Sequence, residues 1–188
     1  HTGHPFDDGS RDAARQLRAR LGGRVTVFTS GSERTRAGWT VSSLSVVAGD
    51  PSRVVCFADP DCDLADRVEQ TGTAVCQFLD ADDQQLADAF AGLMPAPGGV
   101  FTLGSWEETS WGPRLTTAAN WAGLRLESSS ELGWLQQLTF VVERAEVGDG
   151  DAPLHHVRGR YRTLCSAVPG RGARVRPRTR PAGAAARD

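Results

Sequence analysis

Residues 34–51 read Arg34-Thr-Arg-Ala-Gly-Trp-Thr-Val-Ser-Ser-Leu-Ser-Val-Val-Ala-Gly-Asp-Pro51, and the predicted fold depends on this stretch. Along its second half, successive side chains would alternate between the two faces of one strand, and Gly38 allows a close backbone approach at the start. The strand carries hydroxyl side chains, Ser42 and Ser43 among them, which together with backbone N–H groups can hold an oxyanion or another polar ligand. The alternative is a solvent-facing strand on which Ser and Thr are merely tolerated.

The rest of the chain predicts a mainly β domain with short helices. Hydrophobic patterning predicts strands over residues 24–29, 54–57, 73–79, 121–127 and 137–146. Helices are expected in the three segments that begin near Asp or Ser and end at Gly22, Gly72 and Gly92. Residues 31–36 should form a hairpin loop, and residues 93–117 a Gly- and Pro-rich connection.

Length and charge distribution predict one domain followed by a tail. The chain has 188 residues, of which 39% are apolar, enough for one domain with a sizeable core over residues 1–168. Residues 169–188 are rich in Arg, Pro, Gly and Ala without periodicity, which predicts a disordered, solvated tail rather than a nucleic-acid-binding arm. Residues 171–188 carry a net charge of +5, against −7 for the remainder. The absence of lysine excludes a P-loop lysine, a PLP Schiff base and Ser-Lys catalysis.

The four cysteines form no C-x-x-C pair, and Cys56 and Cys76 fall within apolar strand patterns. We therefore expect reduced thiols, a cytoplasmic location and no zinc site. Adjacent His155 and His156 would face opposite sides of a strand and could not easily share one ion, so no metal site is predicted. No apolar run approaches the roughly 18 residues of a membrane helix, and no secretory h-region is seen, so no membrane association is expected.

Several short motifs, taken in their order along the chain, resemble the flavin reductase-like, FMN-binding split-barrel family. The first is Gly38-Trp-Thr-Val-Ser-Ser43, which is followed by Asp50-Pro51 and the apolar strand Val54-Val-Cys-Phe57. Thr71-Gly-Thr-Ala-Val-Cys-Gln-Phe-Leu79 and Gly159-Arg-Tyr161 are similar to later strands of the family. This resemblance implies a six-stranded antiparallel split β-barrel with short flanking helices.

The resemblance also implies an activity, that of an NAD(P)H-dependent flavin oxidoreductase in which hydride passes from nicotinamide to FMN or FAD. The reduced flavin would serve a partner monooxygenase, and a homodimer is implied. Because the cofactor carries the chemistry, no catalytic side chain is expected. Two alternatives stay open: a non-catalytic flavin-binding protein that has lost nicotinamide turnover, and a split barrel that binds haem or a deazaflavin.

The same resemblance assigns eight residues to the flavin. Those of the first motif would line FMN through backbone N–H groups and hydroxyls, and the end of the following strand would touch it by its backbone. An aromatic residue on a later helix matches a family position, although core packing is an equally open role for it. These residues are Gly38, Trp39, Thr40, Ser42, Ser43, Phe57, Ala58 and Phe90.

The sequence departs from the family pattern at the Asp50-Pro51 turn, where Ala48 or Gly49 replaces the usual Ser and Ser52 replaces a second Pro, and at two further places. The family has a Gly-Asp-His before its penultimate strand, where this chain has Gly133-Trp134-Leu135, whose tryptophan could pack in the core or stack on a ring. Asp61 and Asp63 stand where the family favours Ser and Thr near the phosphate. These carboxylates would repel a phosphate unless Arg34 or Arg36 offsets them. The departures put nicotinamide use in more doubt than flavin binding.

Overall fold

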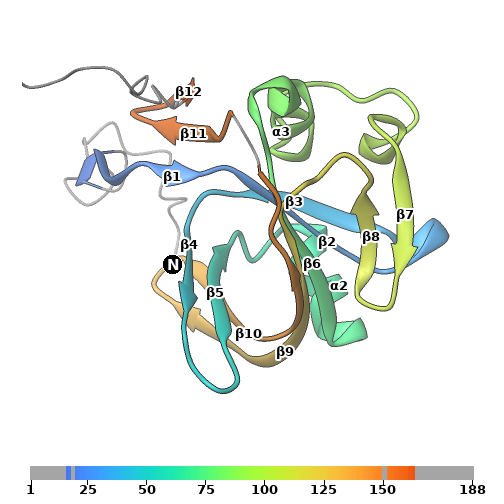
Figure 1. The fold of residues 1–188 in the computed structure, drawn as a ribbon, viewed down its shortest axis with the longest axis vertical. Coiled ribbons are helices and arrows are strands. Elements are labelled where there is room, and N and C mark those ends of the chain that lie inside the picture. Colours follow the sequence, from blue (N-terminus) through green and yellow to red (C-terminus); the bar gives the residue numbers. More distant parts are fainter. Residues whose placement is uncertain (1–15, 18–19, 150–151, 164–188) are drawn as a thin grey trace, which may run out of the picture.

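The computed structural model describes residues 16–17, 20–149 and 152–163, and it consists mainly of β-strands (Figure 1). The helix expected before Gly22 lies mostly outside the described residues. The tail expected over residues 169–188 lies wholly outside them, as does the boundary at residue 168. The division of the chain into a domain and a tail therefore stays a prediction.

Seven strands form one antiparallel sheet in the order β3-β2-β6-β9-β10-β5-β4. Two register shifts, at Thr139/Phe140 and at Val142/Arg144, increase the twist of the long β9–β10 hairpin and help the sheet to curl (Figure 1). The expected antiparallel split barrel with short flanking helices is confirmed, although its sheet has seven strands rather than six. The bounds are β2 (Thr26–Ser30), β3 (Ala37–Val41), β4 (Leu44–Val47), β5 (Arg53–Ala58), β6 (Thr73–Phe78), β9 (Trp121–Leu132) and β10 (Leu135–Glu146).

The two edge strands of this sheet, β3 and β4, follow one another in the chain and are joined by only Ser42 and Ser43. The backbone N–H of Phe57 in β5 donates a hydrogen bond of 3.0 Å to the carbonyl of Ser43. This bond extends the β4–β5 ladder to Ser43, and the two-residue link to Val41 holds the two edges of the curled sheet together. The single strand expected through residues 40–47 is wrong, because β3 pairs with β2 whereas β4 pairs with β5.

Helix α2 (Asp63–Thr71) packs into the concave side of the sheet. It begins after Cys62 rather than at an Asp cap and ends at Gly72, whose φ of 70° suits glycine, as the sequence predicts. Its apolar face is buried with side chains from six strands, and burial of this apolar surface is the main force that stabilises the fold. The cluster includes Phe28, Val54, Cys56, Leu64, Val68, Ala74, Leu124, Leu138 and Phe140.

Helix α3 (Gln84–Phe90) covers the other side of β2 and β3, where a second apolar cluster includes Val27, Leu79 and Phe90. Short 3-10 turns flank the helices at η1 (Glu33–Thr35), η2 (Ala81–Asp83) and η3 (Val100–Thr102). The hairpin loop expected over residues 31–36 is confirmed by η1 and by the β2–β3 pairing.

The connection expected over residues 93–117 contains a hairpin of two strands, β7 (Trp106–Thr109) and β8 (Gly112–Leu115). Thr29 fixes this hairpin to the sheet by donating from Oγ1 to the carbonyl of Pro113 at 2.5 Å. Gln77 accepts a hydrogen bond from the backbone N–H of Leu115 through Oε1. Buried polar groups of the sheet therefore hold a segment that carries little strand signal of its own.

A third, smaller sheet has the order β1-β11-β12, with β1 (Gly23–Arg24), β11 (Leu154–Val157) and β12 (Arg160–Thr163). It lies beside the start of β4 in Figure 1. Within the described ranges of the chain, no helix has the length and apolar character needed to cross a bilayer.

Candidate functional site

Four of the eight residues expected at the flavin meet where the edges of the sheet come together. We call this group, Ser42, Ser43, Phe57 and Ala58, the junction. The carbonyl of Ser43 accepts from the N–H of Phe57, and the Oγ1 of Thr26 donates to the carbonyl of Val41 at 2.7 Å. Both serines are half-buried. The junction is thus a backbone held on both sides, with two hydroxyls at its centre.

Strand β1 of the small sheet also packs against the backbone of the junction. A Cβ atom placed on Gly23 would lie 2.2 Å from the carbonyl oxygen of Ser42. Since no real side chain tolerates such a distance, only glycine allows β1 to lie against this backbone. Because Gly23 has no side chain, the small sheet can pack directly against the junction.

A different set of the expected residues lies at the contact between β3 and α3. The Oγ1 of Thr40 donates to the carbonyl of Ala87 at 2.7 Å, and a Cβ on Gly38 would lie 2.5 Å from Cε1 of Phe90. Phe90 is 2% exposed and meets Phe101 edge to face, with 5.2 Å between the ring centroids. Gly38, Thr40 and Phe90 thus hold the helix on the sheet, and a flavin role for them stays a prediction.

Trp39 faces the opposite side of β3 from Gly38 and Thr40. It is half-buried and packs against the apolar cluster around Phe28. The structure therefore separates the eight residues into the junction, the β3–α3 contact and this core-facing tryptophan.

The loop that follows the junction carries three carboxylates, Asp59, Asp61 and Asp63, all exposed. The backbone N–H of Asp61 donates to Oδ1 of Asp59 at 3.0 Å. Burial raises the pKa of the Cys62 thiol in this loop, backbone hydrogen bonds oppose the shift, and the neighbouring carboxylates add to it. The loop is anionic, and a phosphate would be repelled from it.

Neither expected arginine offsets that charge at the junction. Nε of Arg36 donates to Oε1 of Glu108 at 2.8 Å, so a carboxylate already neutralises it. Ser30 and Thr71, whose hydroxyl oxygens are 2.8 Å apart, place the C-terminal end of α2 beside the start of β3. Arg36 therefore lies near the end of α2 that is opposite Asp63. Arg34 is an exposed residue of η1, in the same loop.

The stretch aligned with the family's Gly-Asp-His forms the turn between β9 and β10, where Gly133 has a φ of 62°. Trp134 is 64% exposed, so its expected core packing is wrong. The residues of β10 that face the junction across the ladder are instead Gln137, opposite Phe57, and Gln136, opposite Ala58.

The two glutamines have different surroundings. Nε2 of Gln136 donates to Oγ of Ser129 at 2.5 Å and to Oε1 of Glu69 at 3.2 Å. The side chain of Gln137 has no hydrogen-bonding partner among the described residues, and it shares a sheet face with Phe57. Sequence reasoning missed Gln137 because a Gln-Gln pair has no motif, and only the strand register places it here.

His155 and His156 point to opposite faces of β11, as predicted. The ring of His156 meets that of Tyr161 with 5.6 Å between centroids, whereas His155 lines a cavity on the other face. In the part of the chain that the structure describes, no three His, Cys, Asp or Glu side chains gather as a metal site.

The chain matches a protein family over most of its length. The family described as "Flavin reductase like domain" matches residues 18–165. The FMN reductase (NADH) RutF of Methylorubrum populi is 31% identical to this chain over 174 residues, which cover 87% of this chain and 85% of that protein.

Two solved structures share the fold at lower identity. The NADH:FAD oxidoreductase SgcE6 of Streptomyces globisporus C-1027, in complex with NAD and FAD fragments, has a TM-score of 0.75 at 20% identity and covers 89% of this chain and 99% of its own. The styrene monooxygenase flavin reductase (SMOB) from Pseudomonas putida S12 has a TM-score of 0.70 at 18% identity, with coverages of 80% and 96%.

Proposed function

Since the chain belongs to the flavin reductase-like domain family, we propose that it is an oxidoreductase that transfers hydride from NADH to FMN or FAD. The observation that carries this proposal is the likeness to an NADH-dependent FMN reductase along 87% of the chain, which includes every residue of the junction. The same likeness favours an enzyme over the non-catalytic flavin-binding alternative.

The junction offers groups that suit the polar edge of a flavin. Ser42 is half-buried, and its Oγ has no hydrogen-bonding partner among the described residues, so this hydroxyl can donate to a ligand and accept from one. The neighbouring Phe57 provides a half-buried ring on the face that it shares with Gln137. The flavin supplies the hydride-accepting ring, and the protein has to bind and orient the two nucleotides. We assign Ser42 and Ser43 to flavin binding and Gln137 to positioning of the nicotinamide.

The anionic loop after β5 does not suit a phosphate. Asp59, Asp61 and Asp63 have no cationic partner among the residues that the structure describes, and they surround the start of α2. Their repulsion cancels the attraction that a helix N-terminus would otherwise offer an anion. We therefore assign only the ring and ribityl chain of the flavin to the junction, and its phosphate needs cations from another element.

The activity test is flavin titration followed by steady-state kinetics. Purified protein should bind FMN or FAD, and added flavin should stimulate NADH oxidation in proportion to protein concentration. Ser42→Ala should weaken flavin binding. Flavin binding without NADH or NADPH oxidation would disprove the enzyme and restore the non-catalytic alternative.

We also propose that the enzyme is a homodimer. Support comes from exposed valines on the edge strand β4, since Val46 is 61% and Val47 48% exposed. Val46 also lines a cavity of about 580 Å³ whose other walls include Phe78 and Val142. Light scattering should give twice the monomer mass for the unmodified chain, and Val46→Asp should shift it toward the monomer. A monomeric unmodified chain would contradict the dimer.

A partner monooxygenase and a cytoplasmic location complete the proposal. The shared fold with a flavin reductase of a styrene monooxygenase supports the partner. The free, buried thiols of Cys56, Cys62 and Cys76 are consistent with a reducing compartment. A flavin-dependent monooxygenase supplied with this protein, FMN and NADH should hydroxylate its substrate. The hydroxylation should not occur when this protein is left out.

A further inference from the structure

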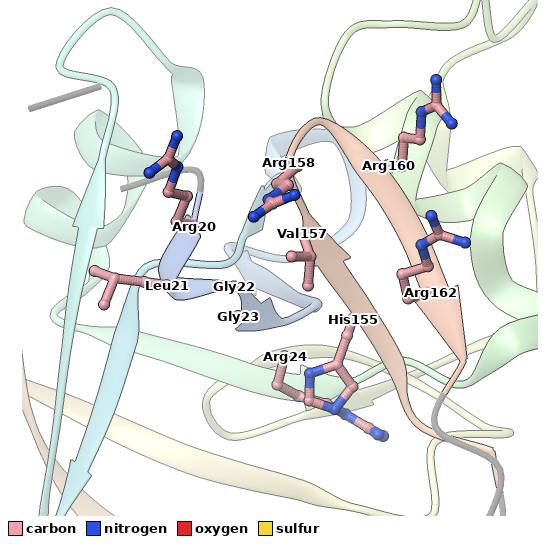
Figure 2. Close-up of a pocket in the computed structure, with 10 residues that line it drawn as sticks. All are labelled: Arg20, Leu21, Gly22, Gly23, Arg24, His155, Val157, Arg158, Arg160 and Arg162. Carbon is pink, nitrogen blue, oxygen red and sulfur yellow. The ribbon is translucent and has the colours of Figure 1, made fainter. Parts of the chain in front are cut away.

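A cavity of about 1020 Å³ opens on one face of the β1-β11-β12 sheet (Figure 2). Five of the ten described residues that line it are arginines, and none of the ten is acidic. The arginines are Arg20, Arg24, Arg158, Arg160 and Arg162. A concave surface with one sign of charge concentrates ligands of the opposite charge.

Strand register explains how these side chains come together. Arg24 of β1 pairs with His155 of β11, which pairs with Arg162 of β12, so the three stand in a row on one face. Arg160 and Arg162 are two residues apart on β12 and share that face. Figure 2 shows the row at the lower right and Arg158 and Arg160 above it. Backbone pairing therefore sets the positions from which the side chains of this row project.

Most of these arginines lack a carboxylate partner, whereas most of the other arginines that the structure describes have one. Arg24 is bound to Asp80 at 2.9 Å. Pairs with glutamate engage Arg36, Arg53, Arg114, Arg125 and Arg144. Within the described residues, the arginines without such a pair are Arg20, Arg34, Arg67, Arg158, Arg160 and Arg162. Four of these line the cavity, so unpaired cationic charge is concentrated there.

The cavity and the junction both adjoin strand β1. Gly22 and Gly23 line the cavity, and the backbone of Gly23 lies against the carbonyl of Ser42. A Cβ on Gly22 would lie 2.9 Å from Cγ2 of Val157, so this glycine brings β1 close to β11 as well. The contact with Ser42 is made on the face that Gly23 shares with His156, whereas Arg24 and His155 lie on the opposite face, so β1 separates the junction from the arginines.

We propose that this face of the β1-β11-β12 sheet binds the phosphate groups of a nucleotide substrate of the enzyme. Guanidinium groups bind phosphate oxygens through paired, charge-assisted hydrogen bonds, which suits a phosphomonoester or a diphosphate. The inference rests on the proposed function for the identity of the nucleotide. It also supplies the cations that the loop of Asp59, Asp61 and Asp63 lacks.

The test uses ligands that differ only in their phosphates. FMN, FAD and riboflavin are titrated into the unmodified protein, into the Arg160→Gln/Arg162→Gln variant, and into Arg34→Gln as a matched control. Arg34 is also exposed and lacks a carboxylate partner in the described chain, but it lies in the loop at the other end of β3. Inorganic pyrophosphate is titrated separately, and the KM for NADH is measured at saturating riboflavin.

We expect the double variant to raise the Kd for FMN and FAD by about tenfold or more, and that for riboflavin by less than about twofold. FMN binding to the double variant should also depend less on salt concentration, and Arg34→Gln should behave like the unmodified protein. A raised KM for NADH with an unchanged Kd for FMN would assign the phosphates to the nicotinamide nucleotide instead. Either result supports the cavity as a phosphate site.

Two results would overturn the inference. One is equal weakening of FMN and riboflavin, and the other is unchanged binding of FMN, FAD, NADH and pyrophosphate in the double variant. Failure of the proposed function would look different, since the unmodified protein would then neither bind flavin nor oxidise NADH. Pyrophosphate binding that is lost in the double variant would still support the cavity in that case.

Discussion

A Cβ atom on Gly38 would lie 2.5 Å from Cε1 of Phe90, so β3 and α3 touch where the chain has no side chain to separate them. Both residues belong to motifs that resemble flavin-binding segments. In the structure they hold the helix against the sheet. Thr40, two residues after Gly38 on the same face of β3, adds a hydrogen bond to the carbonyl of Ala87. Variants in this region therefore change stability, and binding data on them need a stability control.

Gly38→Ala should lower the free energy of unfolding by about 1–3 kcal/mol, because the methyl group overpacks the β3–α3 contact. Urea unfolding monitored by tryptophan fluorescence measures this change. Phe90→Leu in the same chain should recover part of the loss, because the two sites are in contact and their effects are not additive. Strict additivity would show that the methyl group does not meet the Phe90 ring.

Thr40→Val and Ser42→Ala should separate stability from binding. Thr40→Val should cost about 1 kcal/mol of unfolding free energy, since the carbonyl of Ala87 loses one of its two donors and keeps only the N–H of Ala91. Ser42→Ala should change stability by less than about 0.5 kcal/mol, since its hydroxyl has no partner among the described residues. Isothermal titration should show the reverse order for FMN, with a Kd about three- to tenfold higher for Ser42→Ala. An unaltered Kd in that variant would remove Ser42 from the site.

Gln137→Ala should lower kcat/KM for NADH by about fivefold or more, and its melting temperature should stay close to that of the unmodified protein. The physical reason is the position of Gln137 opposite Phe57, on a shared face beside the junction. Gln136→Ala serves as the comparison, because that side chain is bound to Ser129 and Glu69. Gln136→Ala should lower the melting temperature and leave kcat/KM for NADH nearly unchanged. Equal kinetic effects in the two variants would argue against a positioning role for Gln137.

The buried thiol of Cys56 should resist alkylation in the folded protein. Burial raises the pKa of Cys56 to about 12, so at pH 8 its thiolate is on the order of one part in ten thousand. With Cys165 replaced by Ser, iodoacetamide should label the chain only after denaturation, which mass spectrometry measures. Rapid native labelling of Cys56 would show that the sheet opens at β5.

The same shift has a consequence for stability at high pH. Because the pKa of Cys56 is higher in the folded than in the unfolded chain, its neutral form favours folding below the ordinary pKa of 9.0. That contribution is lost as pH rises from about 9 toward 12. Cys56→Ala should therefore show a flatter decline of melting temperature across this range than the unmodified chain.

The sequence predicted those elements whose signals are local. Alternation placed β2, β6 and β10, and the glycines at residues 72 and 92 marked where α2 and α3 end. The break at Ser42 and Ser43 was not predictable, because the alternation continues through it and only the partner strands change. The β7–β8 hairpin was missed because it is short and contains Pro113, which argues against a strand.

Only part of the candidate site could be predicted from the sequence, because the rest depends on which strands pair. Ser42, Ser43, Phe57 and Ala58 were proposed from ordered motifs, and the structure brings these four together. The row of Arg24, His155 and Arg162 needed the pairing of β1 with β11 and of β11 with β12, although the two-residue spacing of Arg160 and Arg162 was a signal in the sequence. Side chains that converge from distant strands cannot be grouped without register.

The hydrogen bond from Phe57 N–H to the carbonyl of Ser43 gives the barrel a built-in reporter. That amide proton is protected only while β5 stays paired with the residue that leads into β4, so its exchange with deuterium measures how often this seam between Phe57 and Ser43 opens. A molecule that spans the seam would slow this exchange at residue 57 while leaving the amides of the distant β9–β10 turn at their original rates.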